Sequence, residues 1–150
     1  MRVTEVRIKL NVIDDKIDKR LLAFASIVLD HEFFVGDLKI VKTPKGLLIS
    51  MPSRKISDHC HQCKTKNAVT SRFCTQCGCK LKENRIKYDI DGRLEIYADI
   101  AHPLNFECRK MIDTAVIGAY YKELELAKQP GYVSRYDEPN RDNKSFSKVL

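Results

Sequence analysis

Residues 21–29 read LLAFASIVL, and every one of them except Ser26 is apolar. Because both faces of this stretch would be apolar in a β-strand, the sequence predicts a strand at the centre of a sheet. Alternating apolar and polar residues lie around it, at residues 6–10, 33–42 and 46–51, and turn residues separate these runs. The short connections favour an antiparallel meander.

A fifth strand and a helix are predicted nearer the C-terminus. Residues 94–100 alternate in the manner of a strand. A helix follows Pro103, with Asn105 as its N-cap and with apolar residues recurring at helical spacing from Cys108 to Tyr120. The predicted fold class is therefore α+β: a small antiparallel β-sheet of about five strands with a C-terminal α-helix.

The positive charge of the chain is concentrated in one segment. The formal net charge is +7, and residues 53–88 hold nine Lys and Arg side chains against two acidic ones. The remaining residues balance, with 18 basic and 18 acidic side chains. A local excess of this kind predicts a surface that meets an acidic partner.

Several classes of protein are disfavoured by the composition. No apolar run among the 150 residues approaches the roughly 20 that a membrane-spanning helix needs. The N-terminal residues alternate apolar and charged side chains, unlike the continuous apolar stretch of a signal peptide. We therefore expect a cytoplasmic protein without membrane attachment, whose six cysteines are thiols or metal ligands rather than disulfides.

Four of the cysteines form two C-x-x-C pairs, Cys60 with Cys63 and Cys74 with Cys77, with ten residues between the pairs. Two such turns can bring four thiolates to one tetrahedral Zn²⁺, at about 2.3 Å from each sulfur. Four thiolates leave no open coordination position, so the sequence predicts one structural zinc per chain. A dithiol redox centre and an iron–sulfur cluster are the alternatives, and no further ligand pattern supports either.

Three stretches of the sequence resemble the septation-protein SpoVG family: residues 22–33 (LAFASIVLDHEF), 46–53 (GLLISMPS) and 99–105 (DIAHPLN). The resemblance covers about residues 3–56 and 93–124, and the cysteine-bearing segment stands where the family has a short connection. It implies a SpoVG-like domain of residues 1–55 and 93–126, interrupted by an inserted zinc ribbon at 56–92. It also implies a homodimer that binds DNA and RNA and regulates septation, sporulation or gene expression. Residues 127–150 are predicted to be a polar, largely disordered tail.

The start of the predicted helix is a candidate phosphate site. Arg109 and Lys110 lie in its first turn, where cations oppose the helix dipole and a bound phosphate would relieve the conflict. The alternative is that Glu107 and Asp113 neutralise the two cations on a solvated face.

Basic residues in and beside the ribbon form a second candidate site. Arg54 and Lys55 match a basic pair of the family, and Phe73 beside Arg72 could stack a base or could pack under the metal. Together with the helix pair, the predicted nucleic-acid contacts are Arg54, Lys55, Lys64, Lys66, Arg72, Arg109 and Lys110.

No catalytic constellation is recognised in the sequence. Asp30 and His31, like Asp99 and His102, lie at the ends of predicted elements, where such side chains usually bond to turn backbone. No nucleophile motif or phosphate-binding loop accompanies them. The sequence therefore predicts a non-enzymatic, nucleic-acid-binding regulator without a small-molecule substrate. The alternative is a protein-interaction adaptor whose ribbon docks on a partner protein.

Overall fold

The computed structural model describes residues 1–11 and 19–139. The chain forms two compact units: Met1–Pro52 together with Pro103–Leu150, and Ser53–His102. Within the described residues, no helix has both the length and the apolar character needed to cross a membrane.

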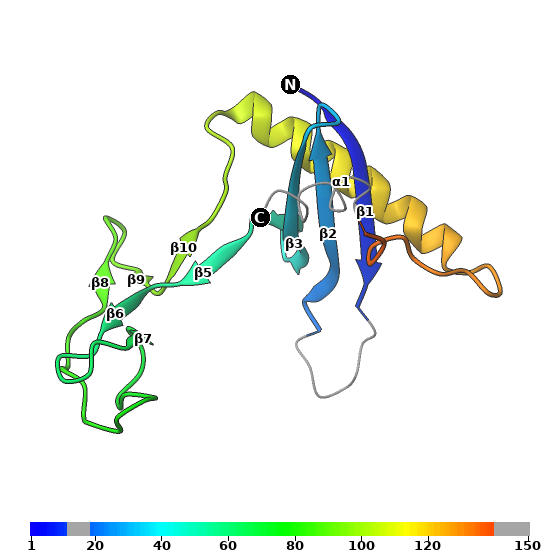
Figure 1. Cartoon of the computed structure of the whole chain (residues 1–150). Helices are drawn as coiled ribbons and strands as arrows, with labels where there is room; N and C mark the ends of the chain where they lie inside the picture. Colours follow the sequence, from blue (N-terminus) through cyan, green and yellow to red (C-terminus); the bar gives the residue numbers. More distant parts are fainter. Residues whose placement is uncertain (12–18, 140–150) are drawn as a thin grey trace. The chain divides into compact units, whose positions relative to one another are not determined.

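The first unit is built on a four-stranded antiparallel sheet, with strand order β1-β2-β3-β4 (Figure 1). The strands are β1 (Val3–Leu10), β2 (Leu21–Leu29), β3 (Phe33–Thr43) and β4 (Gly46–Ser50). The predicted central strand is confirmed, because β2 pairs with β1 on one side and β3 on the other. The α+β class and the antiparallel meander are confirmed as well.

One helix, α1 (Phe106–Leu126), packs against β1, β2 and β4 and covers one face of the sheet (Figure 1). Asn105 caps it as predicted, since its side chain accepts a hydrogen bond from the backbone N–H of Cys108 at 2.8 Å. The buried residues of the helix recur four residues apart, which places them on one stripe facing the sheet. The core consists of Ile112, Val116 and Tyr120 from α1 with Ile8, Ala23, Ala25, Ile27, Leu38, Ile40 and Ile49 from the sheet.

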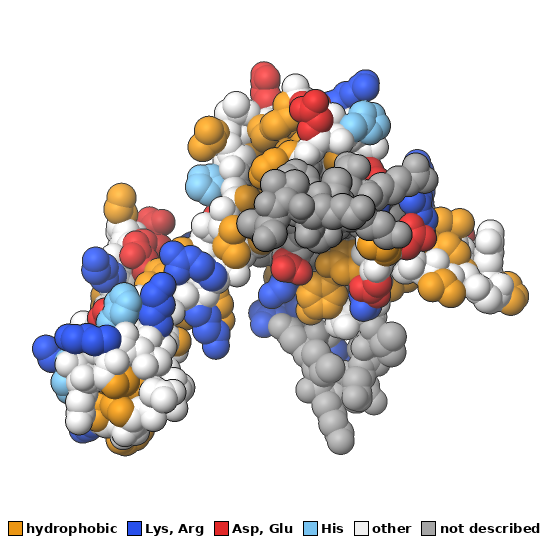
Figure 2. Space-filling model, viewed as in Figure 1, with side chains coloured by type: hydrophobic (Ala, Val, Ile, Leu, Met, Phe, Trp, Pro, Cys, Tyr) orange, Lys and Arg blue, Asp and Glu red, His pale blue; other side chains and the backbone are white. Residues whose placement is uncertain are grey.

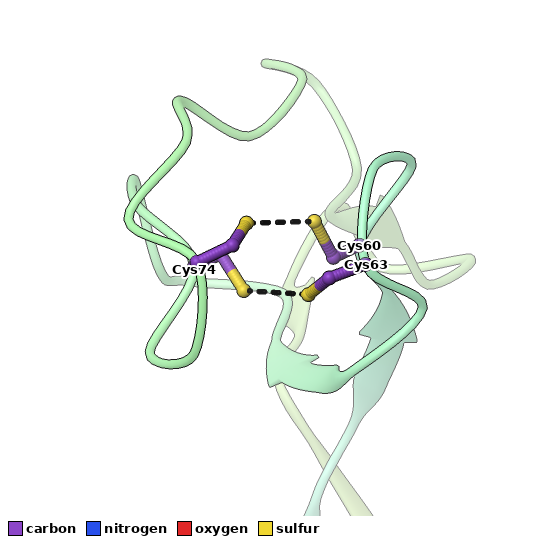
Figure 3. A group of neighbouring side chains, drawn as sticks. Cys60, Cys63 and Cys74 are labelled. Atoms are coloured by element: carbon purple, nitrogen blue, oxygen red, sulfur yellow. Dashed lines mark hydrogen bonds between the residues drawn. The ribbon is translucent and has the colours of Figure 1, made fainter.

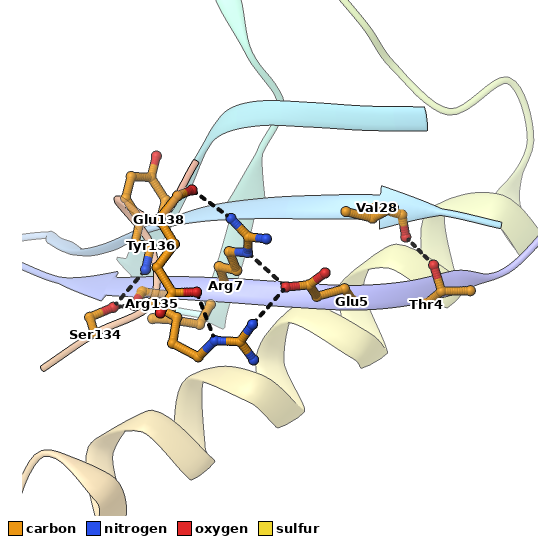
Figure 4. A network of polar contacts seen from close by, with 9 residues as sticks. Thr4, Glu5, Arg7, Val28, Ser134, Arg135, Tyr136 and Glu138 are labelled. Atoms are coloured by element: carbon orange, nitrogen blue, oxygen red, sulfur yellow. Dashed lines mark hydrogen bonds and ion pairs between the residues drawn. The ribbon is translucent and has the colours of Figure 1, made fainter. Parts of the chain in front are cut away.

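The segment after α1 returns to β1 (Figure 4). The Arg7 guanidinium donates to the backbone carbonyl of Glu138 at 2.8 Å, and the Ser134 hydroxyl donates to the carbonyl of Ile8. Lys9 pairs with Asp137 at 3.1 Å. Ser134, Asp137 and Glu138 thus contact the sheet, although they lie in the segment predicted to be largely disordered. Residues 140–150 of that segment lie outside the described part of the chain.

The second unit contains three small antiparallel ladders of two strands each. In these, β5 (Ser53–Lys55) pairs with β10 (Tyr97–Asp99), β6 (Ser57–His59) with β7 (Lys66–Ala68), and β8 (Lys87–Tyr88) with β9 (Leu94–Glu95). The sequence-based domain boundaries at 55/56 and 92/93 stay a prediction, and this compact unit has its own limits at Ser53 and His102.

The large sheet therefore has four strands, where about five were expected. Residues 94–100 do form extended structure, but as β9 and β10, whose partners β8 and β5 belong to the second unit. Pro52 separates β4 from β5, and proline has no N–H to offer to a sheet ladder. The strand that pairs with β10 thus lies beyond this break.

Candidate functional site

Two cysteine pairs meet in the second unit (Figure 3). The four sulfurs of Cys60, Cys63, Cys74 and Cys77 all lie within 4.8 Å of one another. The Sγ atoms of Cys63 and Cys74 are 3.5 Å apart, and those of Cys60 and Cys77 are 3.8 Å apart. A tetrahedral ion bound to sulfur at about 2.3 Å separates its ligands by about 3.8 Å. The cluster therefore has the spacing to hold a metal ion.

Each pair is held in the same type of turn. The backbone N–H two residues after Cys60, and likewise after Cys74, donates to that cysteine's sulfur at 3.4 Å. The chain then turns through a positive φ, +65° at Lys64 and +73° at Gly78. The N–H groups of these two residues bond back to the carbonyls of Cys60 and Cys74 at 3.0 and 3.1 Å. Glycine at position 78 adopts this left-handed conformation without a steric penalty, and Lys64 takes the same conformation without being glycine.

The thiols of the cluster differ in pKa. The backbone N–H of Cys77 lowers the pKa of Cys74 to about 5, and that of Cys63 lowers the pKa of Cys60. The N–H of Cys79 lowers the pKa of Cys77, but the thiol of Cys79 and burial outweigh it and raise that pKa to about 12. The pKa shifts of Cys60 and Cys74 thus favour the thiolate, which is the form that binds metal.

Asn67 is a further residue of the site, and the sequence analysis did not single it out. Its side chain, 3% exposed, donates to the Cys74 sulfur at 3.4 Å and to the carbonyl of Thr65 at 3.1 Å. Its oxygen accepts from the backbone N–H of Thr75 at 2.9 Å. Groups that orient metal ligands in this way tune metal affinity. No spacing or periodicity in the sequence marks this asparagine.

Leu81 and a fifth thiol complete the surroundings of the cluster. Leu81 is 5% exposed and packs against the cysteines, together with the partly buried Cys79. The Cys79 sulfur lies 3.4 Å from that of Cys60. Phe73, in contrast, is 59% exposed. The packing role under the cysteines, one of the two alternatives for Phe73, therefore belongs to Leu81.

The predicted contacts of the second unit lie at its surface, where Lys and Arg side chains gather in Figure 2. The five predicted contacts are all exposed, and within the described residues none of them takes part in an ion pair. These contacts are Arg54, Lys55, Lys64, Lys66 and Arg72. Such side chains are free to meet phosphates.

The helix pair divides into one engaged and one exposed side chain. Nε of Arg109 lies 3.0 Å from a carboxylate oxygen of Asp113, and its Nη2 donates to the backbone carbonyl of Ile49. Lys110 is exposed. Of the two alternatives for this turn, neutralisation by Asp113 is the one the structure shows for Arg109.

The turn after β2 bears out the structural interpretation of Asp30. Its carboxylate accepts a hydrogen bond from the backbone N–H of Arg2 at 2.8 Å. Asp30 and His31 have φ values of +50° and +59°. Asp30 thus bonds to backbone at an element end, as expected.

Comparison with known proteins gives a consistent result. The SpoVG family model matches residues 1–122. A protein of Bdellovibrio bacteriovorus named septation protein SpoVG is 34% identical over 125 residues, which are 83% of this chain and 78% of that relative. Relatives of the same name are 32% identical in Finegoldia magna, over 83% of this chain and 79% of theirs, and in Exiguobacterium sibiricum, over 85% and 92%. The chain therefore belongs to the SpoVG family.

Proposed function

We propose that this protein is a non-enzymatic regulator of the SpoVG type that binds nucleic acid through its second unit. The observation that carries the proposal is the segregation of charge there. Residues 53–88 hold nine basic side chains against two acidic ones, whereas residues 89–102 hold one basic and four acidic side chains. A cationic surface of this kind attracts phosphate backbones. The relatives' name connects them with septation, and we extend this role, or one in sporulation or gene expression, to the present chain.

The ribbon would be held together by one Zn²⁺ on Cys60, Cys63, Cys74 and Cys77. A closed set of four thiolates suits a structural zinc, because it leaves no position for water or substrate. The metal would fix the two cysteine turns and with them the basic side chains between them. Thiolate ligands persist in a reducing compartment, which supports a cytoplasmic setting.

We also propose that the protein is a homodimer. Within the described residues, β1 and β4 are the edge strands of the large sheet, and edges of this kind invite pairing. Large apolar side chains lie exposed on β3 and β4, with Phe33 at 64% and Leu48 at 48%. Light scattering at micromolar concentration is expected to give the mass of two chains, and the mass of one chain would exclude the dimer.

The experiment for nucleic-acid binding is a titration of labelled duplex DNA, duplex RNA and their single strands at several salt concentrations. If each protomer neutralises about three phosphates, log affinity of a dimer falls with log salt at a slope near −5 on duplex DNA. The variant Arg54→Gln with Lys55→Gln is expected to reduce this slope. A chain that binds no nucleic acid even at low salt would refute the proposal and favour the adaptor, whose ribbon docks on a partner protein.

A further inference from the structure

A cleft of about 920 Å³ opens on the second unit, and none of the four clustered cysteines lines it. Its walls come from two segments, residues 69–73 and 80–88, which lie on either side of the second cysteine pair in the sequence. Every lining residue belongs to this one unit. The volume is in the range of pockets that enclose organic ligands, about 300–1,000 Å³, so the cleft can take more than a lone ion.

The cleft is cationic. Four basic side chains line it, and only one acidic side chain, Glu83, lines it as well. Glu83 lies 3.9 Å from Lys80, and both side chains are largely exposed, so this pair is weak. The basic lining residues are Arg72, Lys80, Lys82 and Arg85.

Two aromatic side chains in the lining are exposed. Phe73 is 59% and Tyr88 is 67% exposed, although the buried Leu81 beside them shows that this small unit can bury apolar groups. Solvent-facing aromatic rings among basic side chains are what single-strand binding surfaces use, because the rings stack on bases while the cations hold the phosphates.

The walls are fixed by backbone hydrogen bonds. Phe73 and Lys80 form an isolated antiparallel β-bridge, and the backbone N–H of Leu81 donates to the carbonyl of Arg72 at 2.8 Å. This hairpin carries Cys74 and Cys77 at its turn, so a bound metal would hold it rigid. Preorganised walls lose little conformational entropy when a ligand binds.

Arg85 links the two walls. Its Nη2 donates to the carbonyl of Ser71 at 2.6 Å, and its Nε donates to the carbonyl of Lys82 at 2.9 Å. Its Nη1 is buried and has no hydrogen-bond partner among the described residues. Arg85, which lines the cleft, therefore keeps unsatisfied hydrogen-bonding capacity at this nitrogen.

We propose that this cleft binds single-stranded nucleic acid, with bases stacked on Phe73 and Tyr88 and phosphates held by Arg72, Lys80 and Lys82. The inference rests on the proposed function and narrows it. A duplex keeps its bases stacked inside the helix, where the two rings cannot reach their faces, whereas a single strand offers them. Stacking on bases and pairing with phosphates are common to DNA and RNA, so single strands of both are tested.

The test compares the full chain with Phe73→Leu/Tyr88→Leu, which keeps apolar bulk and removes the flat rings. Each stacked base contributes at least about a fivefold gain in affinity, so the double variant should bind labelled single strands about 25-fold more weakly. Binding to duplex and the salt slope should stay unchanged, because no charge is lost. The matched control is Tyr97→Leu: Tyr97 is 61% exposed in the same unit but does not line the cleft.

The cationic part is tested with Lys80→Gln/Lys82→Gln. The salt slope on single strands should decrease by about 1.4 per protomer, since each lost phosphate contact removes about 0.7. Lys45→Gln, in the exposed turn between β3 and β4, should leave the slope unchanged.

The outcomes separate the two proposals. Wild-type protein that binds no nucleic acid would refute both. If the aromatic variant binds single strands as tightly as wild type does, the cleft is not the binding site, and the proposed function stays in place. If Phe73→Leu/Tyr88→Leu fails to bind its metal, the binding comparison is replaced by photocrosslinking of wild-type protein to single strands that carry 5-iodouracil. Crosslinks to Phe73 or Tyr88 support the cleft, and crosslinks confined to other residues refute it.

Discussion

The side-chain amide of Asn67 donates a hydrogen bond to the sulfur of Cys74 at 3.4 Å. Because the same side chain is anchored to the backbone of Thr65 and Thr75, it fixes one corner of the cysteine cluster in place. This contact links a buried polar residue to the position of a candidate metal ligand.

Asn67→Ala is therefore expected to weaken zinc binding about 10- to 100-fold, the usual cost of losing a group that orients a ligand. Competition with a chromophoric chelator measures this. The control is Asn105→Ala, which removes the N-cap of α1 and should destabilise the first unit by about 1 kcal/mol without changing metal affinity. Equal zinc affinity in wild type and Asn67→Ala would show that the amide only fills space.

Removal of a ligand is expected to unfold one unit and spare the other. Cys60→Ser should abolish stoichiometric zinc and melt residues 57–88, because metal binding supplies folding free energy to such a ribbon. The core of the first unit contains none of the four ligands, so its sheet should stay folded. Elemental analysis and hydrogen exchange resolved by segment report the two effects.

Cys108→Ser is the matched control, since Cys108 lies on α1 among residues packed against the other core. It should keep one zinc per chain. Purified wild-type protein with far less than one zinc would exclude the site, and global unfolding of Cys60→Ser would exclude a ribbon that folds as a separate unit.

The two cysteine turns predict opposite effects of two substitutions. Lys64 adopts a φ of +65°, which strains a residue with a side chain, so Lys64→Gly should stabilise the ribbon by up to about 1 kcal/mol. Gly78 has a φ of +73°, and Gly78→Ala should destabilise it by a similar amount. Thermal unfolding of the zinc-loaded protein measures both. Destabilisation by Lys64→Gly would mean that the lysine side chain stabilises its turn.

Local patterns in the sequence were sufficient to predict some parts of the fold. The apolar run at residues 21–29 required a partner on each side, and the sheet supplies β1 and β3. The convergence of four sulfurs was predictable from the spacing of the cysteine pairs, because a C-x-x-C turn brings its two thiols together locally.

Other features depend on contacts between distant residues. The alternation at residues 94–100 predicts extended structure but carries no information on the partner strand, which turned out to be β5 for β10. Whether Phe73 or Leu81 packs on the cysteines is decided by the hairpin that joins them, and both are apolar in sequence. Arg109 and Lys110 are adjacent cations, yet only the helix position of Arg109 reaches Asp113, four residues on.

This last difference predicts separate roles for the two cations. Arg109→Ala should lower the free energy of unfolding by about 1–2 kcal/mol, because it breaks hydrogen bonds to Asp113 and to the carbonyl of Ile49. It should leave the salt slope of duplex binding unchanged, since the guanidinium is already engaged within the protein.

Lys110→Ala should change the free energy of unfolding by less than about 0.5 kcal/mol, because the lysine side chain is exposed. If the helix start contacts phosphate, Lys110→Ala reduces the slope by about 0.9 per protomer. Denaturant unfolding and titrations at several salt concentrations measure the two quantities. A decrease in slope for Arg109→Ala as large as that for Lys110→Ala would mean that the guanidinium leaves Asp113 for a phosphate when nucleic acid binds.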